Sequence, residues 1–310
     1  MLNIPDPPSN AINPQDFDKA RLAILFSGGL DCTVLARITH DLLPPDEPID
    51  LLNVAFENPR IHKEGASASP YELCPDRVTA RCTYAELQRV CPSRQWRLVT
   101  IDIPYAETLE HRENVVRLMH PHNTEMDLSI CYALYFAARG IGTVNLPNST
   151  KSMPYATSAR VLLSGLGADE LFGGYQRHAT AFSRHGYAGL IEELELDVGR
   201  LGKRNLGRDD RVIANWGREA RFPFLDEELV GWALDAAVNE KCGFGETVSN
   251  EHIKPQDDSM RLEPGKKVLR CLAWKLGMHA VAAEKKRAIQ FGARTAKMET
   301  GKTKGTAAIT

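Results

Sequence analysis

The stretch that most constrains the fold is 21–32, which reads Arg-Leu-Ala-Ile-Leu-Phe-Ser-Gly-Gly-Leu-Asp-Cys. Residues 22–26 are a continuous apolar run of buried-strand length, and the apolar spacing over 30–39 predicts a helix. Paired glycines between them let the backbone approach a bulky anion, because no Cβ stands in the way. The first amides of the helix lack partners within it and lie at the positive end of its dipole. The order strand, glycine turn, helix therefore predicts an anion cradle.

Asp31 sets a condition on that anion. A carboxylate repels a bare phosphate, so its place in the cradle implies a metal ion between the two. The stretch lacks both the lysine of a Walker loop and the three spaced glycines of a dinucleotide fingerprint. A tight strand-to-helix turn capped by Asp31 stays open as the simpler interpretation of this stretch alone.

Composition narrows the class of protein. A chain of 310 residues is long enough for one large domain or two, and its net charge of -2 gives no electrostatic case for nucleic acid as the main partner. Seven cysteines without a Cys-x-x-Cys pair predict reduced thiols and no structural zinc. With no signal peptide and no apolar run near the roughly 20 residues of a membrane span, we expect a cytoplasmic protein.

Further apolar runs over 49–56 and 96–103 predict buried strands, and a short one is predicted over 160–163. Helices are predicted from Asp76, as a cap, to about residue 90, and over 104–119 and 127–139, the last between Asp127 as a cap and Gly140 as a stop. Alternating strands and helices from 21 to 102 indicate a parallel sheet with crossover helices. Ligands of such sheets bind beyond the carboxyl ends of the strands, where the glycine turn lies.

A second loop repeats the logic of the first. The sequence over 164–175 is Ser-Gly-Leu-Gly-Ala-Asp-Glu-Leu-Phe-Gly-Gly-Tyr, and it follows the predicted strand over 160–163. Two such loops on one sheet predict that Asp31 and Asp169 share magnesium with the phosphates of a nucleotide. Simple helix capping by Asp169 and Glu170 is the alternative.

The motifs resemble a known family. The first loop resembles the pyrophosphate loop of the ATP pyrophosphatases, and the second resembles the second signature of the asparagine synthetases. The sequences over 221–226 (Arg-Phe-Pro-Phe-Leu-Asp) and 266–270 (Lys-Lys-Val-Leu-Arg) are similar to later motifs of that family, in the same order. The stretches 75–77, 138–142 and 286–292 are similar to the asparagine synthetase domain-containing subgroup. The resemblance covers roughly residues 20–297.

This resemblance implies an α/β fold of the adenine nucleotide alpha hydrolase-like (ATP pyrophosphatase) type, a parallel sheet with flanking helices and a helical C-terminal part. Its domain would span 20–297, between flexible segments 1–19 and 298–310. In that family the aspartate carboxylate attacks the α phosphate of ATP, giving an acyl adenylate and pyrophosphate. Ammonia then displaces AMP to form the amide. The resemblance thus implies ATP, Mg²⁺, aspartate and ammonia as ligands, and neither nucleic acid nor membrane as a partner.

Roles carried over by position fall into four groups. Those expected to hold pyrophosphate and metal are Ser27, Gly28, Gly29 and Asp31, with Asp169 as the second metal carboxylate. Those expected to hold the rest of ATP are Leu25 and Val54 at the adenine and Ser164 and Gly165. Lys266 would meet the charge that builds on the α phosphate, although a surface lysine is its simpler interpretation. Glu170 and Arg221 are expected on the substrate side; Arg221 could instead pair with Asp226 or Glu227, and Asp226 is expected to cap a helix.

The chain departs from the family in three places. Leu166 stands where the synthetases have glutamate, and leucine cannot handle protons, so the amidation step either uses another base or is impaired. Cys32 replaces serine, a milder change, because a thiol is the weaker hydrogen-bond partner for phosphate. Leu2 follows Met1 where the full-length enzymes have a nucleophilic cysteine, so we expect no glutaminase here and ammonia from solution or from a separate glutaminase subunit.

Other functions stay open at this point. They are another pyrophosphate-loop enzyme such as a tRNA thiolase or a different amide ligase, a non-catalytic domain that still binds ATP, and a dinucleotide binder. The glycine spacing disfavours the last of these.

Overall fold

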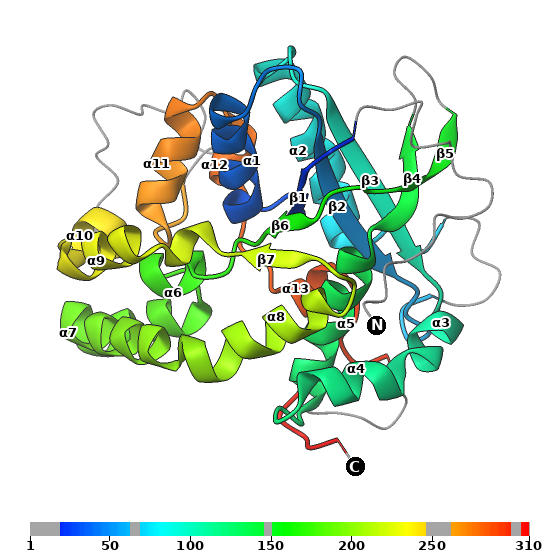
Figure 1. Cartoon of the computed structure of the whole chain (residues 1–310). Helices are drawn as coiled ribbons and strands as arrows, with labels where there is room; N and C mark the ends of the chain where they lie inside the picture. The colour runs from blue at the N-terminus through cyan, green and yellow to red at the C-terminus, as the bar shows by residue number, and fades with distance from the viewer. Residues whose placement is uncertain (1–18, 63–68, 146–150, 246–261, 299–304, 310) are drawn as a thin grey trace.

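The computed structural model describes residues 19–62, 69–145, 151–245, 262–298 and 305–309. This part of the chain contains a seven-stranded sheet in the order β5-β4-β3-β2-β1-β6-β7 (Figure 1). Strands β1 (Leu22–Leu25), β2 (Ile49–Phe56), β3 (Trp96–Ile103), β6 (Val161–Leu163) and β7 (Glu219–Arg221) run parallel to one another. The predicted α/β fold and its parallel sheet are confirmed, with the strands over 49–56 and 96–103 at the predicted bounds.

Two antiparallel strands at one edge escaped prediction. They are β4 (Ile141–Asn145) and β5 (Ser152–Ala156). Both are mostly exposed or half-buried and carry Gly142 and Pro154, so neither shows an apolar run. Gly142 is required there, because a Cβ on it would lie 2.3 Å from the carbonyl oxygen of Thr100 in β3.

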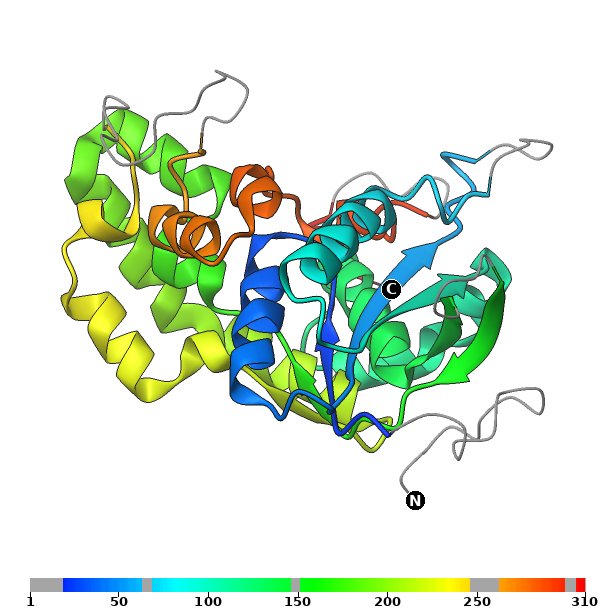
Figure 2. The same cartoon turned by 90° about the horizontal axis from the view of Figure 1, so that it is seen from above.

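Helices cover both faces of the sheet (Figure 2). Alternate residues of β2 point to opposite faces, and both faces are buried, as in a sheet with crossover helices. Leu52, Val54 and Phe56 pack with α5 (Glu125–Arg139), while Ile49 and Leu51 pack with α1 (Leu30–Leu42), α2 (Pro75–Val90), α11 (Lys267–Lys275) and α12 (His279–Ala283).

The remaining helices extend the fold beyond the sheet. Those around β7 are α6 (Ala168–Phe172), α7 (Gln176–Leu201), the π-helical turn η1 (Gly202–Leu206), α8 (Gly207–Ala214), the 3₁₀ turn η2 (Pro223–Leu225), α9 (Glu227–Asp235) and α10 (Val238–Lys241). The others are α3 (Tyr105–Glu110), α4 (Arg112–Met119) and α13 (Ile289–Gly292). In both cartoons α7, α9 and α10 lie to the side of β6 and β7, which is the helical addition expected after residue 175.

Four predicted helix boundaries were wrong. Helix α1 ends at Leu42, not at residue 39. The helix over 104–119 is two helices, which meet at His111. Thr124, not Asp127, caps α5, and its hydroxyl accepts a hydrogen bond from the Asp127 amide at 3.2 Å. Helix α2 begins one residue early, at Pro75, because proline is favoured in the first turn, and Asp76 follows inside that turn. Gly140 ends α5 with φ 70°, as predicted.

The two ends of the chain were predicted to be flexible. Residues 1–18, 299–304 and 310 lie outside the described residues. Residues 305–309, by contrast, pair with the start of α5: the amides of Glu125 and Met126 donate to the carbonyls of Ala307 and Gly305, at 3.0 and 2.9 Å. This end therefore supplies partners to first-turn amides that the helix itself cannot satisfy.

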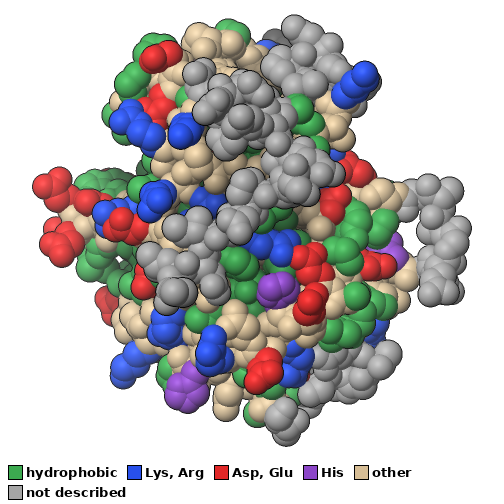
Figure 3. Space-filling model, turned by 45° about the vertical axis from the view of Figure 1, so that its right-hand side comes forward, with side chains coloured by type: hydrophobic (Ala, Val, Ile, Leu, Met, Phe, Trp, Pro, Cys, Tyr) green, Lys and Arg blue, Asp and Glu red, His purple; other side chains and the backbone are tan. Residues whose placement is uncertain are grey.

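The surface carries charges of both signs. Figure 3 shows Lys, Arg, Asp and Glu side chains interspersed over the face in view, in keeping with the net charge of -2. None of the described helices is both long and apolar enough to cross a membrane. All seven cysteines are free thiols, as predicted.

The predicted cap at Asp226 is confirmed, because its carboxylate accepts hydrogen bonds from the amides of Glu228 and Leu229 at 3.0 and 3.4 Å. Asp226→Ala should lower the free energy of unfolding by about 1 kcal/mol, and Asp226→Asn should retain most of it. Urea unfolding measures both. Asp235→Ala at the other end of α9 is the matched control and should cost nothing, since an acidic group is unfavourable there. Equal losses in the two alanine variants would contradict the capping role.

Candidate functional site

The two glycine loops follow β1 and β6, which are neighbouring strands. From β1 the chain builds β2 and β3 on one side of the sheet and later returns to place β6 on the other, so the loops lie at the point where the strand order reverses. Ligands of open α/β sheets bind at such points. The loops touch: a Cβ on Gly165 would lie 3.0 Å from the Asp31 Cβ. Both loops line one cavity of about 580 Å³.

Glycine is required in the first loop. Gly28 has φ 81°, and a Cβ on it would lie 2.4 Å from the amide nitrogen of Ala80 in α2. The Gly28 carbonyl accepts a hydrogen bond from the Thr83 hydroxyl at 2.8 Å. The loop is thus held against α2. Within the loop, the Ser27 hydroxyl accepts a hydrogen bond from the Gly29 amide at 3.3 Å.

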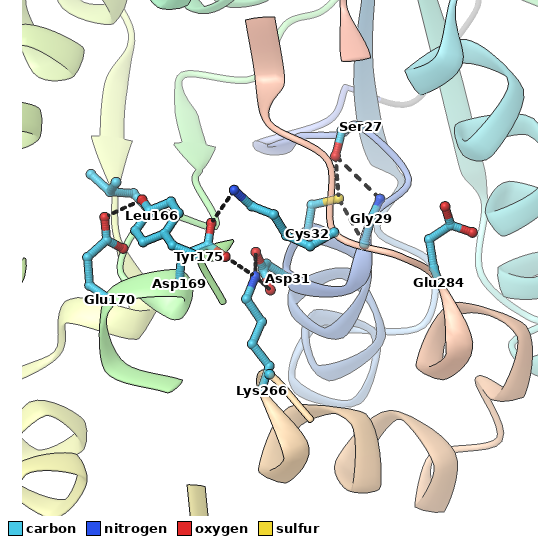
Figure 4. Close-up of polar contacts among 12 residues, drawn as sticks. Ser27, Gly29, Asp31, Cys32, Leu166, Asp169, Glu170, Tyr175, Lys266 and Glu284 are labelled. Atoms are coloured by element: carbon cyan, nitrogen blue, oxygen red, sulfur yellow. Dashed lines mark hydrogen bonds and ion pairs between the residues drawn. The ribbon is translucent and has the colours of Figure 1, made fainter. Parts of the chain in front are cut away.

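Lys266 joins the two loops (Figure 4). Its Nζ lies 2.8 and 2.6 Å from the two carboxylate oxygens of Asp31 and 2.7 Å from Oδ1 of Asp169. Lys266 is only 4% exposed, and its φ of 59° is left-handed, a strained conformation for a residue with a side chain. Gly174 makes room for this pairing, because a Cβ there would lie 1.9 Å from Asp169 Oδ1 and 2.2 Å from Lys266 Cε.

The environment shifts the pKa values of Asp31, Asp169 and Lys266, and not all in the same direction. Burial raises the pKa of Asp31 above its ordinary value, although the Lys266 ammonium opposes this. Burial acts on Asp169 in the same direction, but Lys266 and then Lys286 outweigh it and hold the pKa of Asp169 below its ordinary value. Burial acts to lower the pKa of Lys266, yet the carboxylates of Asp169 and Asp31 raise it, so the lysine stays charged. Lys266 thus bridges the two carboxylates, and a second ammonium, that of Lys286, lies 3.8 Å from Asp169 Oδ2.

This arrangement suits a divalent cation. Three carboxylate oxygens from both loops already lie within 2.8 Å of one positive centre, the Lys266 ammonium. Magnesium prefers one or two carboxylates completed by substrate phosphate oxygens and water. Asp31 and Asp169 would supply such carboxylates from the two loops. Among the described residues, no group of three or more His, Cys, Asp or Glu could hold a metal ion.

The cavity has an apolar part and a charged part, and the charged part carries both acidic and basic side chains. Its apolar lining comes from the sheet, α5 and α13, with Leu25, Val54, Ile130, Ala133, Ile289 and Ala293. Its cationic lining beside the glycine loops comes from Lys266, Lys285, Lys286 and Arg287. Such a division suits a ligand with a flat apolar ring and a strongly anionic tail.

Most residues predicted for the site line this cavity. They are Leu25, Ser27, Gly29, Asp31, Val54, Ser164, Gly165, Asp169, Glu170 and Lys266. Gly28 is not among the described residues that line the cavity, but it packs against α2 and so supports the first glycine loop. Lys266 is buried rather than on the surface, which was its simpler interpretation.

Arg221 does not lie where it was expected. Its side chain is 61% exposed and pairs with Glu219 at 2.8 Å, not with Asp226 or Glu227, and Arg221 is not among the described residues that line the cavity. Both residues face outward from the short edge strand β7, so the shared face decides the pairing. Arg221 still supports the site through its carbonyl, which accepts a hydrogen bond from the Ser164 amide at 2.9 Å.

Glu170 lies deeper than a helix cap would. It is buried, and its carboxylate accepts a hydrogen bond from the Tyr175 hydroxyl at 2.6 Å (Figure 4). Burial raises the pKa of Glu170. Leu166 lines the cavity on the same loop, so the position that lacks a carboxylate does face the site.

Sequence reasoning missed several charged groups of the cavity, and three of them lie beside the glycine loops. Lys286 and Arg287 belong to a stretch that resembles a family subgroup, but no role was attached to it. Asp76 belongs to another such stretch, 75–77, and its own predicted role was that of a helix cap. The structure shows Asp76 6% exposed in the cavity wall, 3.6 Å from the Arg287 guanidinium. The signal for Asp76 is an acidic residue in the first turn of a helix that packs against the glycine loop.

The fold and the site together define the class: an adenine nucleotide alpha hydrolase-like domain with paired glycine loops. The asparagine synthase family model matches residues 150–192 and 184–307, about half of the chain, and the chain belongs to that family.

Several relatives are similar over most of this chain. Asparagine synthetase domain-containing protein 1 of Bos taurus is 41% identical over 311 residues, 91% of this chain and 46% of the relative. The protein of the same name in Homo sapiens is 40% identical, over 91% and 46%. An asparagine synthetase domain-containing protein of Saccharomyces cerevisiae is 38% identical, over 93% and 50%. The chain thus spans about half the length of these curated relatives.

Asp76 gives the domain a pH dependence. Burial raises its pKa to about 7 from 3.8, against the opposing charge of Arg287. The folded state therefore binds this proton more tightly than the unfolded state, and stability is lost as the pH rises through that interval. The free energy of unfolding of Asp76→Asn minus that of the parent should therefore rise by about 2 kcal/mol from about pH 5 to about pH 8.

Urea unfolding at the two pH values measures this difference. Asp46→Asn, at an exposed position, is the control and should follow the parent at both. Parallel behaviour of Asp76→Asn and the parent would show that Asp76 does not hold a proton in the folded state.

Proposed function

We propose that this protein is an ATP-dependent ligase that forms asparagine: it adenylates the side-chain carboxylate of aspartate and then lets ammonia displace AMP. The observation that carries the proposal is the meeting of Asp31, Asp169 and Lys266 between two glycine loops at the switch point of the sheet. Membership of the asparagine synthase family supports it. The same comparison supports ATP as the substrate.

The cavity divides ATP between its two parts. The adenine would lie against Leu25, Val54 and Ile289, where its flat ring replaces water on apolar side chains. The phosphates would lie over the Ser27–Gly29 turn, at the positive end of the 13-residue helix α1. A glycine pair permits this close approach.

The negative charge of the substrates requires more positive charge than the backbone amides supply. At about 4 Å and an effective dielectric near 20, one charge pair is worth roughly 4 kcal/mol. A single lysine therefore cannot offset the repulsion among the several negative charges of a triphosphate and a carboxylate. Mg²⁺ held by Asp31 and Asp169 would supply the additional positive charge. Lys266 would release these carboxylates when the substrates bind. Its ammonium would then stabilise the negative charge that builds on the α phosphate.

The bond changes balance without a redox partner. An aspartate carboxylate oxygen bonds to the α phosphorus, and the bond from that phosphorus to the bridging oxygen breaks, so pyrophosphate leaves with the electron pair. Ammonia nitrogen then bonds to the acyl carbon, AMP leaves, and nitrogen loses a proton. Leu166 cannot accept that proton, so another base or water must do so.

A second function is favoured by one observation. Leu166 faces the cavity where a base would act, which supports a domain that binds ATP and activates a carboxylate but amidates poorly. A ligase that acts on a different carboxylate is the other alternative. Free thiols support a reducing compartment such as the cytoplasm, and the balanced charge supports small molecules over nucleic acid as partners.

Exchange of labelled pyrophosphate into ATP tests the first step. The parent protein should catalyse exchange that depends on aspartate and Mg²⁺. Exchange with another carboxylate would change the substrate, and ATP binding without any exchange would support the non-catalytic alternative.

Asp31→Asn should abolish this exchange while the far-ultraviolet circular dichroism and the melting temperature stay near those of the parent, because the amide keeps the shape but not the charge. Asp41→Asn is the matched control on the same helix; it removes only a surface pair with Arg37 and should exchange at the parental rate. Parental exchange by Asp31→Asn would remove Asp31 from the mechanism.

Leu166→Glu tests the second step. If Leu166 limits amidation, the substitution should raise amide formation by about 100-fold and leave pyrophosphate exchange unchanged, since only proton transfer is affected. Leu166→Gln is the control with equal size and no base. An unchanged ratio of amide formation to exchange in Leu166→Glu would show that the missing carboxylate is not the limit.

A further inference from the structure

Arg77 is a fully buried arginine that reaches the strand beside the first glycine loop, and the proposed reaction gives it no role. Its Nε donates to Oδ1 of Asn53 at 2.6 Å. Its two other nitrogens pair with Oε1 of Glu72 at 2.9 Å and with Oδ1 of Asp102 at 2.7 Å. These two exposed carboxylates hold the guanidinium from the surface while its inner edge binds Asn53.

Asn53 carries this connection from Arg77 to the end of β1. It is a buried residue of β2, and its Nδ2 donates to the carbonyl of Phe26 at 2.9 Å and to that of Asp76 at 3.3 Å. Because a guanidinium can only donate, the amide oxygen must face Arg77 and the NH₂ group must face the two carbonyls. Both N–H groups are thus engaged, so Asn53 lines the cavity without a donor left for a ligand.

Phe26 is the last residue before the glycine turn, and the Asn53 side chain holds its carbonyl. In a trans peptide, the C=O of one residue and the N–H of the next point in opposite directions. The hydrogen bond from Asn53 therefore sets the direction of the Ser27 amide. An asparagine on the neighbouring strand thus controls the first peptide unit of the loop.

The next peptide unit but one is held in the same way. The Thr83 hydroxyl donates to the Gly28 carbonyl at 2.8 Å, which sets the direction of the Gly29 amide. Glycine populates both signs of φ readily, so a turn with two glycines has several conformations open to it unless its carbonyls are held. The two hydrogen bonds therefore preorganise the amides that a bound anion would contact.

We infer that Asn53 is a positioning residue for the first glycine loop, and that Arg77 keeps the Asn53 amide in the orientation this requires. Neither donates to the ligand. Asn53 holds the Phe26 carbonyl, so the loop amides meet the anion without a change of backbone conformation. A loop that must first be ordered binds more weakly, because the cost of ordering reduces the binding free energy. That the anion is a phosphate of ATP rests on the proposed function, whereas the effect on the loop rests on the hydrogen bonds alone.

Asn53→Asp and Asn53→Leu test this role. Both roughly keep the size of the side chain and lack the NH₂ group; aspartate can still accept from Arg77, whereas leucine cannot. Calorimetry in the presence of Mg²⁺ should show that each variant binds inorganic pyrophosphate about tenfold more weakly and adenosine within about twofold of the parent, since adenosine has no phosphate. A loss in the aspartate variant alone would mark repulsion by its added charge and would overturn the inference.

Asn58→Asp is the matched control. Asn58 is also buried, follows the same strand and donates through Nδ2 to two carbonyls, those of Arg294 and Ala296, at 2.9 and 3.0 Å. It is not among the described residues that line the cavity. This variant loses the same kind of hydrogen bonds and should bind pyrophosphate with the parental affinity.

Hydrogen exchange of the ligand-free full chain, measured by mass spectrometry, tests the loop itself. Peptides over 26–33 should exchange faster in both Asn53 variants, while peptides over 96–103 keep the parental rate, because only the turn is freed. The parental rate over 26–33 in both variants, or an equal loss of pyrophosphate and adenosine binding, would overturn the inference. A parent protein that binds no pyrophosphate would count against the proposed function, and hydrogen exchange alone would then decide the role of Asn53.

Discussion

The Lys266 ammonium between Asp31 and Asp169 is the interaction on which the rest of the site depends. It joins the starts of α1, α6 and α11, which are far apart in the sequence, at one point in the cavity wall. Without the lysine, Asp31 would lose the cation that both of its carboxylate oxygens contact, and Asp169 would keep only the longer 3.8 Å pair with Lys286, which is destabilising. The local backbone is arranged around it: Gly174 leaves space for it, and Lys266 itself adopts a left-handed conformation.

Sheet topology brings these groups together. The loops after β1 and β6 meet because the strands are neighbours, and the strand order reverses between them. Positive groups then surround the same space: the amides of the first loop, Lys266 and Lys286. The two ammonium groups lie beside carboxylates of the protein, so these charges are offset when no ligand is bound. A polyphosphate with a divalent cation would exchange these internal pairs for external ones.

Local pattern predicted the buried elements well. Strands β2 and β3 were predicted at their observed bounds because both faces are covered, which makes the apolar run continuous. The edge hairpin β4–β5 lacks that run, and Arg221 lies on the exposed face of the edge strand β7 together with Glu219. The motifs predicted the contact between the loops, but not that Lys266 would pair with both carboxylates, nor that Lys286, Arg287 and Asp76 would complete the cavity. Those contacts join segments about 100 to 240 residues apart, where no local periodicity applies.

A crystal structure with Mn²⁺ and an ATP analogue that carries a methylene bridge between the α and β phosphates is the most direct test of the central claim. Anomalous scattering should place Mn²⁺ between Asp31 and Asp169, with the Lys266 Nζ displaced from both carboxylates and within hydrogen-bond distance of the α phosphate. Lys266 still bound to both carboxylates, with the metal and the phosphates elsewhere in the cavity, would contradict the account.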